Sequence, residues 1–140
     1  MLLYLMPSLW LGAAVAGGAL AQDKRQDRTQ VVNPPADAKS LVETGSLSSA
    51  ETMTYTIDAK SGHSASVKFK ANNAKCGFLI YGPGQTPGEN AAMFDSAASG
   101  NQFSGFLPAT GTYLVRIALD REAARNMQTC DYTVTFAVAR

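Results

Sequence analysis

Two arginines four residues apart, Arg121 and Arg125, are the residues whose type and spacing most clearly suggest binding chemistry. They lie in the short stretch DREAARNM, which has helical composition, and residues four apart in a helical turn share one face. Two guanidinium groups side by side would form an outward fork that binds carboxylates. In the alternative interpretation Asp120, Glu122 and Asp131 neutralise both arginines locally, and composition by itself favours this second interpretation.

The rest of the sequence lacks the residue patterns that are typical of enzymes. The one histidine, His63, lies in a predicted turn, and no Ser-His-Asp triad can be named around it. Neither a phosphate-binding loop nor a metal-ligand spacing is present. We therefore predict a protein that is not an enzyme and that uses no cofactor or metal ion. The net charge of +1 implies neither nucleic acid nor an anionic membrane as a partner.

The first residues predict export from the cytoplasm. Residues 1–21 carry no charged side chain and end in Ala19-Leu20-Ala21, an A-x-A cleavage pattern, so a signal peptide cleaved before Gln22 is the natural interpretation. The alternative is an uncleaved membrane anchor, because the run is just long enough to span a bilayer. Residues 22–39 are polar and predict a flexible or irregular segment.

Two cysteines, Cys76 and Cys130, follow in the exported part. An even pair in an oxidising compartment predicts a disulfide. Cys76 shares its strand parity with Phe78, and Cys130 shares its parity with Tyr132, so both side chains are predicted to point inward. Two free thiols or a metal site are the alternatives, although one distant histidine does not complete a zinc site.

Strict alternation of apolar and polar side chains is the main structural signal from residue 40 onward. Such alternation, rich in β-branched and aromatic residues, indicates half-buried antiparallel strands. About seven to eight short strands predict an all-β antiparallel β-sandwich over residues 40–140. The residues predicted to face the core are Tyr55, Ile57, Ala59, Ala65, Val67, Phe69, Tyr113, Val115, Ile117, Leu119, Cys130, Tyr132, Val134, Phe136 and Val138.

Several motifs resemble the periplasmic inhibitors of g-type lysozyme. They are TYT at 54–56, AKSG at 59–62, YGPG at 81–84, LPATGTYLVRI at 107–117, REAARN at 121–126 and YTV at 132–134, so the resemblance spans roughly residues 40–138. The LPATGTY element also occurs in bacterial pre-peptidase C-terminal β-sandwich modules. The R-x-x-x-R pattern directly after that strand is the more discriminating feature.

This resemblance implies a function and a set of contact residues. In the inhibitor family, loops at one end of a β-sandwich enter the substrate cleft of the lysozyme, and two arginines of one loop tip are among the contacts. The corresponding residues here are Arg121 and Arg125. The loops at 46–51 and 82–90 would support them, through Ser49, Ala50, Glu51, Gly82, Pro83 and Gly84.

The sequence also departs from the family pattern at two places. A tyrosine expected before the strand at 54–56 is absent, and the two cysteines are not part of the pattern. For the 82–90 loop, the glycine and proline content more simply fixes a sharp turn than a binding function.

Together these features predict an inhibitor of g-type lysozyme that is periplasmic or secreted, soluble once its signal is removed. The alternative is a non-catalytic module of the pre-peptidase type that binds a polymer or protein of the cell envelope. Sugar-binding modules normally expose tryptophan or tyrosine platforms. The only tryptophan, Trp10, lies in the predicted signal peptide, and the strand tyrosines fall on core parity, which disfavours a sugar ligand.

Overall fold

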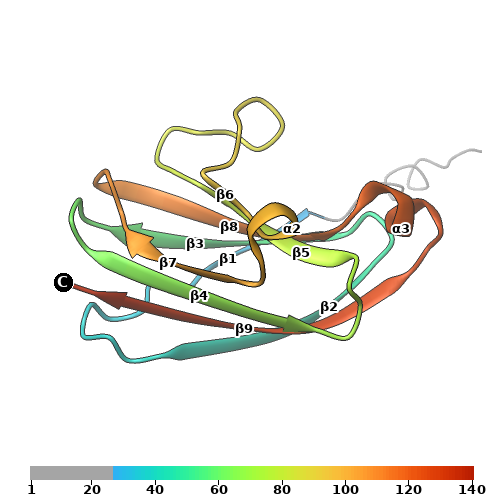
Figure 1. Ribbon diagram of the computed structural model, residues 1–140, viewed down its shortest axis with the longest axis horizontal. Helices are drawn as coiled ribbons and strands as arrows, with labels where there is room; N and C mark the ends of the chain where they lie inside the picture. The colour runs from blue at the N-terminus through green and yellow to red at the C-terminus, as the bar shows by residue number, and fades with distance from the viewer. Residues whose placement is uncertain (1–26) are drawn as a thin grey trace, which may run out of the picture.

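Two β-sheets packed face to face form the protein in the computed structural model, which describes residues 27–140 (Figure 1). The predicted signal peptide and its cleavage before Gln22 lie outside the described residues. The strands are β1 (Asp27–Val31), β2 (Leu41–Ser48), β3 (Thr52–Ala59), β4 (Ser64–Ala71), β5 (Cys76–Tyr81), β6 (Phe94–Asp95), β7 (Gln102–Phe106), β8 (Gly111–Leu119) and β9 (Thr129–Ala139). Two short helices, α2 (Ser96–Ser99) and α3 (Arg121–Arg125), join strands in this part of the chain.

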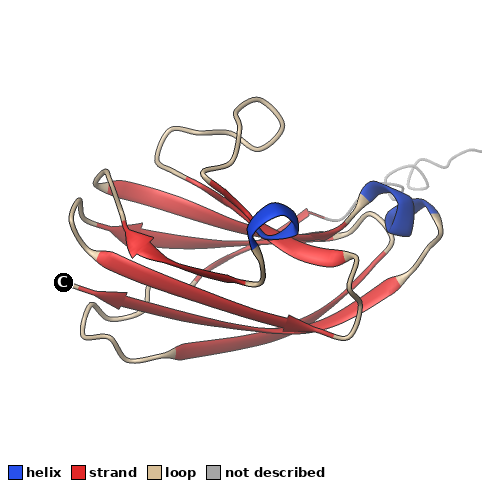
Figure 2. Cartoon of the chain, in the orientation of Figure 1, coloured by secondary structure: helices blue, strands red, loops and turns tan. Residues whose placement is uncertain are grey.

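The sheet topology confirms the predicted all-β sandwich. One sheet has five strands in the order β1-β3-β8-β5-β6, and the other has four in the order β2-β9-β4-β7. All pairs are antiparallel except β1 with β3, which is parallel. In Figure 2 strands make up both layers, and α3 lies beyond the strand ends at one end of the sandwich. None of the helices found between residues 27 and 140 has the length and apolarity to cross a membrane.

Strand β1 is a difference from the sequence-based expectation. The segment 22–39 is predicted to be flexible or irregular, yet Asp27–Val31 pairs with β3. The Thr52 hydroxyl donates to the Asp27 carboxylate at 2.6 Å, and the Arg28 guanidinium donates to the Ser46 carbonyl at 2.9 Å. All five residues of β1 are exposed, so the strand has no alternation of apolar and polar side chains that a sequence pattern could reveal.

The core forms where the inward faces of the two sheets meet, as the alternation predicts. The inward residues of β3, β8 and β9 named above are all buried, and those of β4 are buried except Ala65, which is half-buried. Ile117 on β8 and Val134 and Phe136 on β9 belong to one core cluster and have no measurable exposure. Burial of this continuous apolar layer is the dominant stabilising contribution to such a fold.

A disulfide between Cys76 and Cys130 confirms the predicted pairing, with the two Cα atoms 6.2 Å apart. Cys76 is the first residue of β5 in the five-stranded sheet, and Cys130 belongs to β9 in the four-stranded sheet. Both residues are buried. The bond therefore joins the two layers covalently at the end of the sandwich that carries α3.

A pair of tyrosines also links the layers. The hydroxyls of Tyr55 on β3 and Tyr132 on β9 share a buried hydrogen bond of 2.8 Å. Gly45, opposite Tyr132 on β2, leaves the space that this ring occupies, because a Cβ atom there would collide with the Tyr132 hydroxyl. Burial raises the pKa of both phenols, and for Tyr55 the hydrogen bond that it shares with Tyr132 raises the pKa further.

Removal of the disulfide should destabilise the fold. We expect Cys76→Ala/Cys130→Ala to lower the free energy of unfolding by about 2–5 kcal/mol, because the bond closes a long loop in the unfolded chain. Denaturant unfolding of the variant, and of the wild type with and without reductant, measures the effect. An unchanged unfolding midpoint in both comparisons would show that the bond does not contribute to stability.

The tyrosine pair should make the protein sensitive to alkaline pH. Because the folded-state pKa values lie above the unfolded value, the contribution is complete below about pH 10 and is lost as the pH rises further. Tyr55→Phe alone leaves the Tyr132 hydroxyl buried without its partner and should cost about 1–3 kcal/mol. The double variant Tyr55→Phe/Tyr132→Phe should be more stable than either single variant and less sensitive above pH 10, as measured by denaturant unfolding at several pH values.

Candidate partner-binding site

Helix α3 lies at one end of the sandwich (Figure 1). Both predicted arginines belong to this helix and are exposed. The helix begins because the Asp120 carboxylate accepts a hydrogen bond from the Ala123 N–H at 2.8 Å, which is an N-cap. Ala123 is 1% exposed and fixes the helix against the core. Arg121 and Arg125 lie on either side of it in sequence and are exposed. Both arginines are thus exposed residues of one helical turn, four positions apart, as the sequence predicts.

Two of the three carboxylates that were candidates to neutralise these arginines, Asp120 and Asp131, have other partners. The Asp120 carboxylate caps α3 and lies 3.9 Å from the Lys75 ammonium group. Asp131 accepts hydrogen bonds from the side chains of Ser46, at 2.6 Å, and Asn72, at 3.3 Å. Within residues 27–140, no ion pair joins Asp120, Glu122 or Asp131 to either arginine. The interpretation in which they are neutralised locally is therefore not supported.

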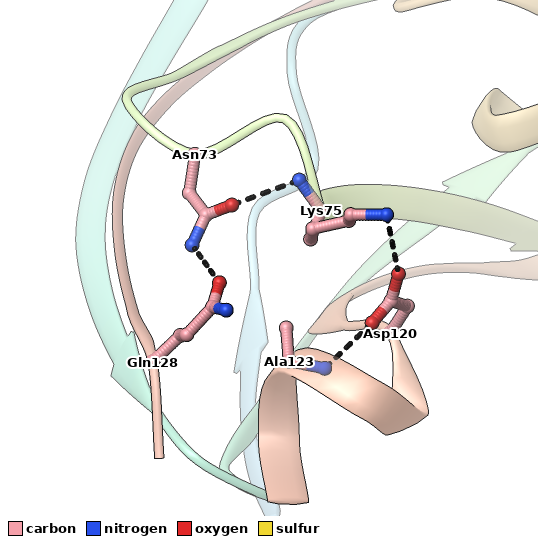
Figure 3. Close-up of polar contacts among 5 residues, drawn as sticks. All are labelled: Asn73, Lys75, Asp120, Ala123 and Gln128. Atoms are coloured by element: carbon pink, nitrogen blue, oxygen red, sulfur yellow. Dashed lines mark hydrogen bonds and ion pairs between the residues drawn. The ribbon is translucent and has the colours of Figure 1, made fainter. Parts of the chain in front are cut away.

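The turn between β4 and β5 makes hydrogen bonds with the chain just before α3, at Asp120, and just after it, at Gln128 and Thr129 (Figure 3). The Asn73 side-chain amide donates to the Gln128 side chain and to the Thr129 carbonyl, both at 3.0 Å. At the other end, the Asp120 N–H donates to the Lys75 carbonyl at 2.9 Å. Sequence reasoning missed Asn73, although asparagine next to a strand end is a recognised turn signal.

The turn between β2 and β3 lies beside the same segment. The Ser49 N–H donates to the Gln128 carbonyl at 2.9 Å, and Ser49 adopts a positive φ of 54°. The Glu51 carboxylate accepts a hydrogen bond from the Ser48 N–H at 2.8 Å, so Glu51 stabilises its own turn. Ala50 is exposed at the turn. The structure therefore brings Ser49, Ala50 and Glu51 to the end that carries the arginines.

Gly82, Pro83 and Gly84 lie elsewhere. Pro83 packs against Gly111, since a Cβ atom at Gly111 would lie 2.7 Å from the Pro83 Cβ. Gly111 begins β8 and Leu119, next to α3, ends it, which separates the two sites by roughly 26 Å of extended chain. Figure 1 shows the loop after β5 rising away from the sheets, apart from α3. The structure does not bring this loop to the arginines, because it lies beside the first residue of β8 whereas α3 follows the last residue of that strand.

Other surface features offer less for binding. A groove of about 680 Å³ lies over β2, β9 and β4, with exposed polar residues such as Lys70. Its aromatic lining residue, Tyr132, is 3% exposed and offers no stacking platform. His63 borders a second cavity of about 310 Å³ together with Gly111, at the end opposite α3. In the described part of the chain, no cluster of three or more histidine, cysteine or acidic residues could hold a metal ion.

The described residues therefore form a β-sandwich that carries an exposed, basic loop tip, held by hydrogen bonds, at one end. Comparison with family models and with curated proteins finds no match. Among solved structures, the chain is similar to Aeromonas hydrophila PliG, a periplasmic lysozyme inhibitor of g-type lysozyme, with a TM-score of 0.74 and 27% identity over 82% of this chain and 99% of that one.

Two further inhibitor structures share the fold. A mutant of Escherichia coli PliG has a TM-score of 0.58 and 24% identity over 81% of this chain and 98% of that chain. Salmonella Typhimurium PliG has a TM-score of 0.57 and 21% identity over 79% of this chain and 97% of that chain. Both are also periplasmic inhibitors of g-type lysozyme. The likeness to the Aeromonas hydrophila structure confirms the resemblance that the motifs indicate, and the other two structures share the fold.

Loss of the N-cap should loosen the arginine-bearing tip. We expect Asp120→Ala to cost about 1 kcal/mol and to speed hydrogen exchange at the Ala123 amide, because that N–H loses its acceptor. Asp95→Ala is a matched control, since Asp95 caps α2 in the same way through the Ala97 N–H. Exchange at Ala123 that rises equally in both variants would contradict a local role for Asp120.

Proposed function

We propose that this chain is a periplasmic inhibitor of g-type lysozyme that blocks the substrate cleft of the enzyme with the tip formed by α3. The observation that carries the proposal is the likeness to the Aeromonas hydrophila inhibitor, which extends over 99% of that chain. The exposed guanidinium pair of Arg121 and Arg125, with no carboxylate of its own segment bound to it, supports the assignment of the tip.

The chemistry of the target explains how such a tip would inhibit. A glycoside hydrolase donates a proton to the leaving group from a carboxylic acid in its cleft. A guanidinium against that group stabilises the ionised form and lowers its pKa, so the acid loses the proton it must donate. Arginine suits this role because its planar fork binds a carboxylate through two hydrogen bonds. The loop itself would also exclude the polysaccharide from the cleft.

The environment of the site fits a preformed inhibitor. The Asn73 brace, the Asp120 cap and the Cys76–Cys130 bond all lie at the base of the tip. A tip held in place before binding loses little conformational entropy on association. The disulfide also agrees with an oxidising compartment such as the periplasm. The function proposed is binding and not catalysis, in line with the three inhibitor structures.

The alternative of a polymer-binding module of the pre-peptidase type is disfavoured by the burial of its candidate platforms. Tyr55, Tyr113 and Tyr132 are 1%, 2% and 3% exposed. The Tyr113 hydroxyl also donates to the Ala109 carbonyl, within its own turn. These three tyrosines are therefore structural and offer no face on which a sugar ring could stack.

Reversal of both tip charges should abolish inhibition without unfolding the protein. Arg121→Glu/Arg125→Glu places like charges against the cleft acid, which costs several kcal/mol of binding free energy at an interface. The fold should remain intact, because substitutions of exposed residues usually change the free energy of unfolding by less than about 0.5 kcal/mol. Inhibition is measured as the rate at which g-type lysozyme clears a cell-wall suspension. Arg→Lys at both sites should retain part of the effect, and added salt should slow association of the wild type.

A second double variant controls for overall charge. Lys39→Glu/Lys60→Glu changes the net charge by the same amount, and both lysines are exposed and remote from α3. It should inhibit like the wild type. Equal inhibition by the wild type and the arginine variant would show that the tip is not the inhibitory element. Parallel assays with c-type and i-type lysozymes establish which enzyme is the target.

A further inference from the structure

The chain reverses direction after α3 at Met127, a residue type that rarely occupies such a turn. Helix α3 is followed by its C-cap Asn126, and Met127 then adopts a left-handed conformation with φ of 56°. The Met127 N–H donates to the Ala124 carbonyl at 3.1 Å, and the Gln128 N–H donates to the Ala123 carbonyl at 3.0 Å. These two hydrogen bonds define a Schellman motif, in which the left-handed position is usually glycine.

Methionine in this position does not contribute to packing within the chain. A Cβ atom disfavours the left-handed conformation, and only glycine or asparagine adopts it readily. Buried apolar contacts could compensate, but Met127 is 73% exposed. The backbone therefore holds a long apolar side chain in solvent, two residues from Arg125. Unfavourable backbone conformations that persist without a structural benefit are typical of functional sites.

The location of Met127 distinguishes it from other exposed apolar residues. Between residues 27 and 140 the remaining large exposed apolar side chains are Val31, Val42, Met93 and Phe106. Phe106 pairs with Ser64, and Ser64 pairs with Ala139, at the end of the sandwich opposite α3. Val31 ends the edge strand β1 and pairs with Thr56, and Val42 is the second residue of the edge strand β2 and pairs with Thr135. Met93 donates its N–H to the Ile80 carbonyl. Met127 alone among them belongs to the arginine tip.

We infer that Met127 is an apolar anchor that packs against apolar side chains of the target cleft while Arg121 and Arg125 bind the carboxylate beside it. The inference rests on the proposed function and adds a contact residue to it. An ion pair gains strength when neighbouring apolar groups exclude water from it. Methionine is suited to the task because its flexible thioether adapts to an irregular surface and contacts aromatic rings favourably.

Three substitutions at Met127 separate the side chain from the turn. Met127→Ala removes the side chain and keeps the left-handed strain, and should weaken inhibition about tenfold or more. Met127→Gly also removes the side chain but relieves the strain, so it should inhibit as weakly as the alanine variant while melting at a higher temperature than the wild type. Met127→Leu restores apolar volume and should remain within about threefold of the wild type. Phe106→Ala, at the opposite end, is the control and should not change inhibition.

The outcomes distinguish this inference from the function on which it rests. If the alanine variant inhibits g-type lysozyme as strongly as the wild type while Arg121→Glu/Arg125→Glu is inactive, Met127 is not an anchor and the proposed function stands. If the glycine variant regains the inhibition that the alanine variant loses, the turn and not the side chain caused the loss, which overturns the inference. If the wild type inhibits no g-type lysozyme, both proposals fail.

Discussion

The covalent link between the two sheets, at the end that carries α3, is the constraint on which the candidate site depends. Cys76 lies opposite Leu119, the last residue of β8 before α3. Cys130 lies opposite Leu47, which precedes the turn that contains Ser49. One bond therefore lies beneath both loops of the tip and sets the spacing of the layers from which they emerge. Small domains of this size commonly use such a bond because their apolar core is modest.

Polar side chains around this link bind one another and leave the arginines available. Asp120 caps its own helix, Asn73 holds Gln128, and Glu51 closes its own turn. These hydrogen bonds satisfy backbone and side-chain polar groups at the helix and turn ends, which would otherwise lack a partner within the chain. The consequence is a tip whose backbone is held by its short side chains, while its long cationic side chains stay in solvent. A tip with a held backbone and free cationic side chains can bind a charged cleft with little change in its own backbone conformation.

Sequence patterns predict the fold well where one face of a strand is buried. In β8 and β9 every second residue is apolar and buried, so the period of two could be read directly. Parity also places both cysteines inward, and the disulfide follows from it. The same method misses β1, whose residues are all exposed, and the two-residue β6, which is too short for a period. For the site, the i and i+4 spacing of the arginines is sufficient to place them on one exposed face.

The sequence by itself determined the class of fold, the inward residues, the pairing of the cysteines and the exposed arginine pair, because each depends on local periodicity or on residue type. Only the tertiary structure decided which loops share an end of the sandwich. Ser49 meets Gln128 and Asn73 meets Thr129, whereas Pro83 packs on Gly111 at the other end. These groupings depend on strand direction and on the order of strands in each sheet, which are set by long-range backbone pairing and by the packing of the two layers. The exposure of Met127 likewise could be seen only in the structure, which packs Ala123 of α3 against the core and leaves Met127 in solvent.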